Sequence, residues 1–181
     1  KPQIDNKTGM DAAEQLSEIF RAVAPLYKKR DKIYREVAGL LCEKGIAHPQ
    51  MESLTAEERS FAEKYFIADV LPVLSPQIIN AHHPFPHLVN KAIYIVLQLK
   101  ISDKTAYGII PMPAMQDRLI FLPGSGVRYI LLEELIYQYA ERVFDNCEIH
   151  AKSIICVTRN ADINVDSLPD EDEDFRHHMK K

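Results

Sequence analysis

A proline-rich segment, residues 72–91, divides this chain of 181 residues into two halves with different hydrophobic patterns. Its sequence, PVLSPQIINAHHPFPHLVNK, contains four prolines, three histidines and two asparagines. Proline lacks a backbone N–H and keeps the residue before it out of the helical region, so neither a long helix nor a central strand can run through this segment. The chain is therefore predicted to form two regular parts joined by an irregular connection.

The half before residue 72 has the spacing of helices. A first helix is predicted over residues 16–44, with a kink or a break near Pro25 and an end at Gly45, a residue suited to the left-handed conformation. Apolar residues recur every three or four positions and form one stripe of this helix: Leu16, Ile19, Phe20, Val23, Leu26, Tyr27, Ile33, Tyr34, Val37, Leu40 and Leu41.

A second helix is predicted to start at Thr55, which has the spacing of a capping box with Glu58, and to stop before Pro72. Its inward side chains would be Phe61, Ala62, Tyr65 and Phe66. Two helices form a hairpin with one uncovered face, so we expect a third helix to complete a bundle.

The half after the proline-rich segment is predicted to be a sheet with a packed helix. Residues 92–100 (AIYIVLQLK) alternate in the period of a strand. Further strands are predicted at 106–111, 119–122, 127–131 and 153–158, and a helix at 132–144. This order predicts an α+β fold, in which a helical hairpin that is part of a helical bundle precedes a mixed β-sheet with its helix.

Composition excludes several classes. The net charge of -4 gives no overall basic surface for nucleic acid, so only a local patch could bind a polyanion. Three cysteines without C-x-x-C spacing indicate reduced thiols. No apolar run reaches the roughly 20 residues of a membrane span. We expect a cytoplasmic protein, with a peripheral position at the inner face of the membrane as an alternative.

Two motifs invite a functional interpretation that the residues do not favour. His82, His83 and His87 could suggest a metal site, but the intervening prolines forbid a ligating helix. We expect instead a rigid extended loop in which Phe85 packs and His83 makes a backbone hydrogen bond. The sequence PGSG at 123–126 lacks the ending of a P-loop and is predicted to be a turn between strands. No catalytic, cofactor-binding or metal-ligating residue is predicted.

Four cations beside predicted strands are the candidate phosphate-binding residues. Arg159 could bind phosphate through a bidentate fork, but Asp162 lies three residues away, and we favour an ion pair between the two. Lys91, Arg118 and Arg128 are the other three, and lone surface charges of this kind are usually only solvated.

Four short motifs resemble one known family. They are PVLSP at 72–76, HPFP at 83–86, NK at 90–91 and VTRNAD at 157–162, and their order resembles the start of the middle, or head, domain of bacterial polyphosphate kinases. The resemblance extends over nearly the whole chain, because further matching segments fall in family order between the second and last motifs: Ile110-Pro111, Leu122-Pro123 and Leu132–Ile136.

This resemblance implies an internal piece of a much longer enzyme. Residues 1–71 would end the N-terminal helical domain, and residues 72–181 would begin the head domain, whose family role includes subunit contacts. The parent would use ATP and Mg²⁺ to extend polyphosphate through a phosphohistidine. In the family that histidine lies in later domains, so the chain alone should be an inactive structural and assembly portion. Its partners would be the other domains of the enzyme and further subunits of a homo-oligomer.

Two other interpretations stay open. The chain could be a stand-alone protein-interaction module that binds a partner through its exposed helical face. It could also be a small enzyme that handles a phosphohistidine, with His83 as the reacting group.

Overall fold

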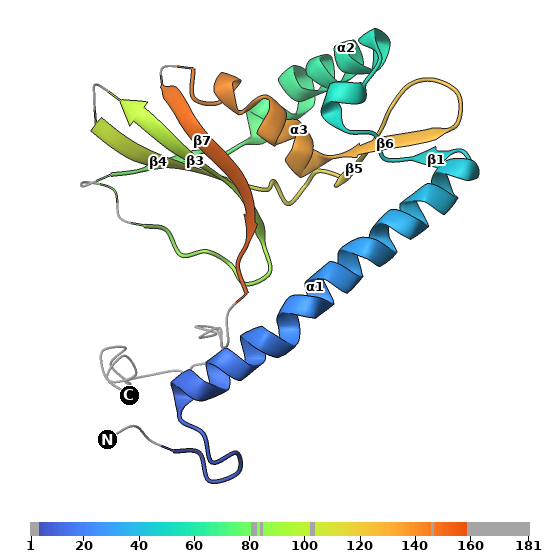
Figure 1. The fold of residues 1–181 in the computed structure, drawn as a ribbon. Coiled ribbons are helices and arrows are strands. Elements are labelled where there is room, and N and C mark those ends of the chain that lie inside the picture. The colour runs from blue at the N-terminus through green and yellow to red at the C-terminus, as the bar shows by residue number, and fades with distance from the viewer. Residues whose placement is uncertain (1–3, 81–82, 84, 102–103, 146, 159–181) are drawn as a thin grey trace, which may run out of the picture. The chain divides into compact units, whose positions relative to one another are not determined.

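A computed structural model describes residues 4–80, 83, 85–101, 104–145 and 147–158. The chain divides into two compact units, residues 1–72 with 115–139 and residues 73–114 with 140–181 (Figure 1). Helices and both parallel and antiparallel strand pairs occur, so the predicted α+β class is confirmed. The predicted domain boundary after residue 71 stays a prediction. In the described residues, no helix combines the length and the apolar character that crossing a membrane requires.

Helix α1, Ala12–Glu43, opens the first unit and is 32 residues long. A capping box starts it, because Asp11 accepts from the N–H of Glu14 while the Glu14 carboxylate accepts from the N–H of Asp11. The helix continues through Pro25, so of the kink or break predicted near Arg21 to Pro25 the break does not occur, and the kink stays a prediction. Proline removes only one hydrogen bond, and the amphipathic pattern resumes beyond it. The predicted end at Gly45 is confirmed by its positive φ of 79°.

No residue of α1 is buried. Leu16, Phe20 and Tyr27 keep 51%, 64% and 56% of their surface exposed. The described residues of this unit therefore leave the apolar face of α1 largely uncovered. An amphipathic helix in a protein gains most of its stability from packing of its apolar face, so α1 lacks most of that stabilisation here.

Helix α2, Ala56–Tyr65, begins at Thr55 with the predicted capping box, since the Thr55 side chain accepts from the Glu58 N–H and Glu58 accepts from the Thr55 N–H. A π-helical turn, Phe66–Val70, extends it, and a 3₁₀ turn, Leu71–Val73, contains Pro72. Of the four side chains expected inside, Ala62 and Phe66 are fully buried and Tyr65 is half-buried. Phe61, in contrast, lies at the surface, so its predicted burial was wrong.

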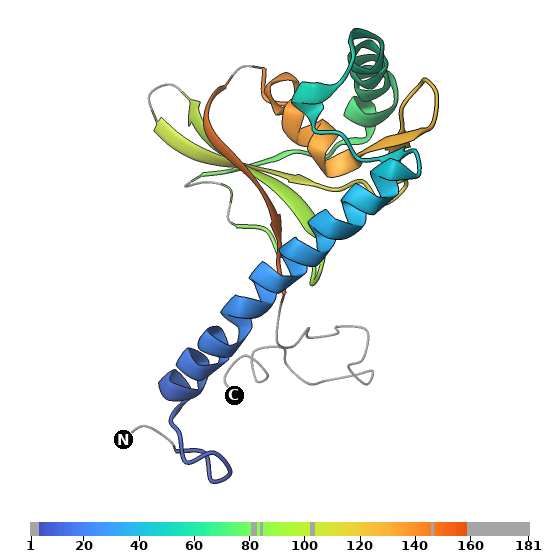
Figure 2. The ribbon, with the colours of Figure 1, turned by 45° about the vertical axis from the view of Figure 1, so that its right-hand side comes forward.

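A three-stranded sheet completes the first unit, with β1 (Ile46–Ala47) parallel to β6 (Val127–Leu131), which is antiparallel to β5 (Leu119–Phe121). The loop at 123–126 closes the β5–β6 hairpin, as predicted. Helix α3, Leu132–Gln138, follows β6 directly and lies beside α2 and its π-helical turn in both ribbon views (Figures 1 and 2). The core of this unit consists of Leu54, Ala62, Phe66, Val70, Ile120, Leu122, Ile130, Leu132, Leu135 and Ile136.

The second unit is built on an antiparallel sheet of four strands in the order β2-β4-β3-β7. The strands are β2 (Gln77–Ile79), β3 (Ile93–Ile101), β4 (Lys104–Pro111) and β7 (Glu148–Cys156), and Figure 2 shows their twist. A short 3₁₀ helix, Ala140–Arg142, precedes β7. Alternate residues of β3, Ile95, Leu97 and Leu99, are fully buried, which confirms the predicted period.

Gly108 occupies a position in β4 where the sheet has no room for a side chain. A Cβ atom there would lie 2.8 Å from Cζ of Phe144 and 3.1 Å from Cδ1 of Leu99. We therefore expect Gly108→Ala to destabilise the chain by about 1–3 kcal/mol through overpacking, measured by urea denaturation. Combining it with Phe144→Leu should recover part of this loss relative to the two single variants. An unchanged unfolding midpoint for Gly108→Ala would contradict this account of the packing.

Candidate functional site

Of the four predicted cations, Lys91, Arg118 and Arg128 lie within the described residues. Arg118 and Arg128 lie at opposite ends of the β5–β6 hairpin, since the Arg118 carbonyl accepts from the N–H of Leu132 and the Arg128 carbonyl from that of Leu122. These ends are four residue steps apart, or about 13 Å along the strands. The two arginines therefore do not form a single phosphate clamp. Arg159, with its predicted partner Asp162, lies outside the described residues.

Arg128 forms an ion pair with a buried carboxylate of α2. Its Nε and Nη2 atoms donate to Oε1 and Oε2 of Glu58 at 2.5 and 3.2 Å. The Glu58 side chain is 4% exposed and that of Arg128 33%. The hydrogen bond from Arg128, opposed by burial, holds the pKa of Glu58 below its usual value of 4.5. Glu58 thus joins the start of α2 to strand β6, and this guanidinium is committed to a structural contact.

Arg118 forms a similar pair with the first turn of α3. Its Nε atom donates to both carboxylate oxygens of Glu133, at 2.9 and 3.2 Å, and its Nη2 atom donates to Oε1 at 2.5 Å. The Glu133 side chain is buried, whereas that of Arg118 is 60% exposed. Glu133 lies in the first turn of α3, where its negative charge interacts favourably with the positive end of the helix dipole. The pair fastens the first turn of α3 to the residue that precedes β5.

Lys91 lies in the second unit, immediately before β3. It is a non-glycine residue with a positive φ, 62°, and its N–H donates to the carbonyl of Val157 at 2.7 Å. This backbone contact brings the start of β3 to the end of β7. The Lys91 side chain is exposed. A phosphate role for it, as for Arg118, Arg128 and Arg159, stays a prediction.

The histidine-containing loop has the backbone contacts expected of it but not the packing. His83 and Asn80 exchange two backbone hydrogen bonds of 3.2 Å, which confirms the predicted backbone bond of His83. Phe85 is 65% exposed, so its predicted packing was wrong. A hollow of about 620 Å³ beside this loop is lined by His83, Asn80 and residues 76–79 with Ile101, none of them lysine or arginine. Its described lining residues therefore include no lysine or arginine that could bind a phosphate group.

A tyrosine–histidine–glutamate chain in the first unit was missed from the sequence. His48 accepts from or donates to Tyr34 through Nδ1, 3.1 Å from the hydroxyl, and contacts Oε2 of Glu134 through Nε2 at 2.8 Å. Its ring stacks on that of Tyr129 with centroids 5.0 Å apart. Desolvation, with Tyr129 and Glu134 nearby, raises the pKa of Tyr34, so the phenol stays protonated and can donate to Nδ1. Nε2 then carries the proton shared with Glu134.

This constellation fixes structure more readily than it performs chemistry. Both ring nitrogens of His48 are engaged, so neither is directed at a phosphorus atom. The adjoining cavity is only about 50 Å³, far smaller than an ordinary ligand pocket. Glu134 also accepts from the N–H of Leu131, and so caps α3. The hydrogen bonds from Tyr34 to His48 and from His48 to Glu134 thus join α1 to α3, and the His48 ring stacks on Tyr129 of β6.

A further hollow and the metal-type residues of the described part of the chain add no catalytic centre. A cavity of about 270 Å³ in the first unit is lined by Met51, Glu52, Arg59, Gln138 and Tyr139, with Arg59 as its one cation. In the part of the chain that the structure describes, no three His, Cys, Asp or Glu residues are placed to hold a metal ion. The site geometry therefore supports ion pairs that assemble elements rather than a group that transfers phosphate.

Comparison with known proteins gives consistent matches. Residues 57–181 match the family model of the polyphosphate kinase middle domain. Polyphosphate kinase of Bacillus cereus is 33% identical over 172 residues, covering 90% of this chain and 24% of that protein. Its counterpart in Halalkalibacterium halodurans is 32% identical over 167 residues, covering 89% and 24%.

The fold has a solved counterpart as well. The crystal structure of polyphosphate kinase from Porphyromonas gingivalis has a TM-score of 0.68 and 20% identity, covering 84% of this chain and 26% of that chain. The chain therefore spans about a quarter of the length of the relatives that it matches.

Proposed function

Because the chain belongs to the polyphosphate kinase family, we propose that it is a structural and assembly portion of an enzyme that transfers the terminal phosphate of ATP to polyphosphate. The main support is the match of residues 57–181 to the middle domain of that family. Relatives carry about three quarters of their length outside the matched region, which leaves room there for the catalytic groups.

The contacts of the described cations support a non-catalytic role. Arg118 and Arg128 each face a buried carboxylate of the chain itself, Glu133 and Glu58. An arginine that neutralises a buried carboxylate cannot be diverted to phosphate without leaving that charge uncompensated, which is energetically costly. We propose that these residues hold the sheet and helices in place, while the rest of the enzyme supplies the ATP and Mg²⁺ sites.

A phosphohistidine intermediate would use a histidine outside this chain. Phosphoryl transfer to imidazole requires an available ring nitrogen in line with the phosphorus atom. His48 has both nitrogens engaged, and Nδ1 of His83 lies 3.2 Å from the side-chain oxygen of Asn80. The described residues that line the hollow beside His83 also include no lysine or arginine. These observations favour the assembly role over the alternative in which His83 reacts.

The assembly role has its own support in α1. Its exposed apolar side chains form a surface that other parts of the enzyme, or another subunit, could cover. A stand-alone interaction module would have the same surface. The two proposals differ in whether the chain is part of a longer polypeptide, which the length of the native open reading frame decides.

Activity measurements test the proposal directly. With labelled ATP and Mg²⁺, the full-length enzyme should produce polyphosphate on an alkaline gel and acquire an acid-labile label. The 181-residue chain should do neither, because it would lack the phosphoryl acceptor. Stable label on His83 or on another histidine of the chain would refute the assembly role, and a full-length protein without synthesis would refute the enzyme assignment.

A further inference from the structure

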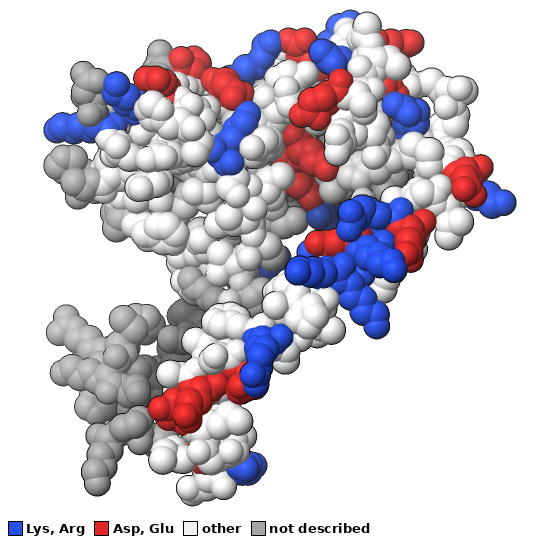
Figure 3. All heavy atoms as spheres, viewed as in Figure 1, with Lys and Arg blue, Asp and Glu red and all other residues white. Residues whose placement is uncertain are grey.

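The middle of α1 carries a local excess of positive charge. Residues 28–36, KKRDKIYRE, contain five cations and two acidic residues, although the whole chain has a net charge of -4. Figure 3 shows lysine and arginine side chains gathered over the middle of this helix. All five cations are exposed. Such a cluster creates a local positive field that overall composition does not reveal.

Helix geometry sorts these cations into two groups. At about 100° per residue, Lys28, Lys32 and Arg35 fall within an arc of about 60°, and Lys29 lies next to it. These four residues, Lys28, Lys29, Lys32 and Arg35, are named the basic stripe. Arg30 lies on the opposite side, over the ring of Tyr27 at 5.1 Å and paired with Asp31 at 2.7 Å.

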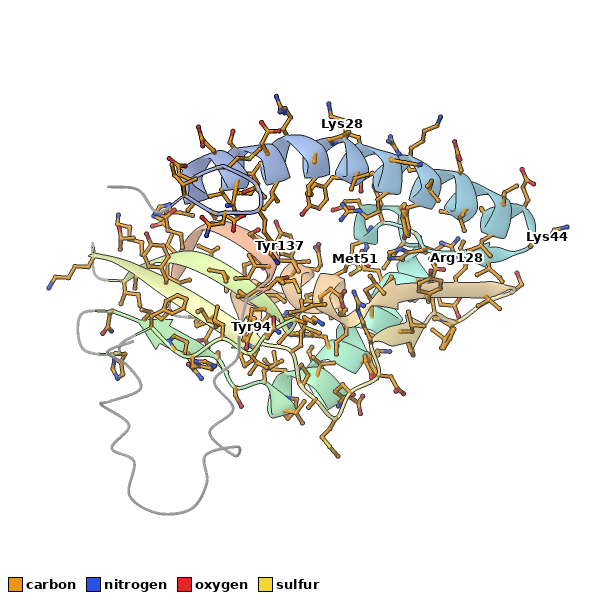
Figure 4. The ribbon with its side chains drawn as sticks, turned by 90° about the horizontal axis from the view of Figure 1, so that it is seen from below. Lys28, Lys44, Met51, Tyr94, Arg128 and Tyr137 are labelled. Atoms are coloured by element: carbon orange, nitrogen blue, oxygen red, sulfur yellow. The ribbon has the colours of Figure 1, made fainter. Side chains whose placement is uncertain are left out.

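The basic stripe lies opposite the apolar face of the helix. Figure 4 shows Lys28 on the side of α1 that points away from Met51 and Arg128. Among the described residues, Lys28 and Lys29 have no ion pair, and Lys32 has only a loose one with Glu36, at 3.8 Å and largely in solvent. An exposed pair of this kind contributes little and yields readily to a stronger anion.

Resting on the proposed function, we propose that the basic stripe binds inorganic polyphosphate outside the catalytic centre. Several cations in a row complement a linear chain of phosphates. Three of the four are lysines, which act as mobile point charges rather than fixed forks, so they suit a chain that slides. The bound product would stay near the enzyme at a high effective concentration and would be extended further before release.

The composition of the stripe favours polyphosphate over nucleic acid. Single-stranded nucleic acids gain much of their affinity from bases stacked on aromatic rings. The nearest aromatic residues of α1, Tyr27 and Tyr34, lie on the far side, about 100° or more from Lys28. Polyphosphate needs only the cations.

Charge-matched variants test this site. The stripe variant replaces Lys28, Lys29, Lys32 and Arg35 with Gln, and the control variant replaces four exposed lysines elsewhere, Lys7, Lys44, Lys64 and Lys104, with Gln. Gln is a good helix former, so circular dichroism should show α1 intact in both. Fluorescence anisotropy with labelled inorganic polyphosphate then measures binding by the 181-residue chain.

We expect the stripe variant to bind about tenfold or more weakly than wild type and with a shallower salt dependence, while the control variant stays within about twofold. Equal affinities of the two variants would overturn the proposal, as would absence of binding by wild type at low salt. Preference for a single-stranded RNA of equal charge over polyphosphate would overturn it too, because the stripe would then be a nucleic-acid surface.

The full-length enzyme separates this inference from the proposed function. There, the stripe variant should release shorter polyphosphate chains than the control variant, as judged on alkaline gels. Unchanged product length would overturn the inference and leave the proposed function standing. If the wild-type enzyme makes no polyphosphate, the proposed function fails, while the anisotropy result still decides whether the stripe binds this polyanion.

Discussion

Replacing Arg128 with methionine should destabilise the chain by about 3 kcal/mol, measured by urea denaturation. The substitution keeps an apolar stem against β6 but leaves the Glu58 carboxylate, 4% exposed, without the two hydrogen bonds from the guanidinium. The value lies at the lower end of the range for broken buried pairs because a third of the Arg128 side chain is in solvent. Glu58 would retain only its bonds with Thr55.

Two variants make this prediction specific. Arg59→Met removes a guanidinium from α2, next to Glu58. Arg59 is exposed and, among the described residues, makes one long contact of 3.4 Å with the Glu52 carbonyl, so the effect should stay within about 0.5 kcal/mol. Glu58→Gln combined with Arg128→Met removes both charges and should recover part of the stability lost by Arg128→Met alone. An Arg128→Met variant as stable as the Arg59→Met control would contradict a structural role for the pair.

Acid should reveal the same interaction. Arg128 lowers the pKa of Glu58 in the folded chain, so the pair contributes stability above the ordinary glutamate pKa of 4.5, and this contribution is lost as pH falls through the depressed folded value. Wild type should therefore lose more unfolding free energy below pH 4.5 than Arg128→Met does. If the unfolding free energies of the two proteins changed with pH in parallel, Arg128 would not stabilise the ionised Glu58 carboxylate.

Local signals in the sequence predicted local structure well. The capping box of Thr55 and Glu58, the helix end at Gly45 and the alternation of β3 each depend on residues within a few positions, and each is confirmed. The predicted last strand, 153–158, misses the first part of β7, where Glu148, His150 and Lys152 obscure the pattern of an edge strand. The predicted helix at 132–144 exceeds α3, which stops at Gln138.

Contacts between distant residues could not be predicted in this way. Glu58 was assigned to a helix cap, and nothing near it indicates the partner 70 residues later. The same holds for His48 and Glu134, which are 86 residues apart. Strands β1 and β2 have only two and three residues, too few for a periodic pattern, and they form because a longer strand pairs with them. Phe85 is apolar, but among the described residues it stays 65% exposed, which its apolar character did not indicate.

Replacing Phe20 with aspartate should have a small effect on the stability of the 181-residue chain and a large effect on that of the full-length enzyme. Phe20 is 64% exposed on α1, so the chain alone should lose no more than about 0.5 kcal/mol. Wild-type chain should self-associate through the apolar face of α1, because exposed apolar patches of this size attract partners, and the charge of the variant should abolish that association. Sedimentation over a wide concentration range measures both states.

In the full-length enzyme, the proposed covering of this face by another domain or subunit makes the same aspartate a buried, unpaired charge. We expect a loss of about 3 kcal/mol or more, seen as a lower midpoint of unfolding or as failure to assemble. Ser17→Asp, an exposed position on the polar side of the same helix, adds the same charge and should be tolerated in both proteins. Equal tolerance of Phe20→Asp and Ser17→Asp in the full-length enzyme would mean that the apolar face of α1 stays in solvent there, and the assembly role assigned to this helix would fail.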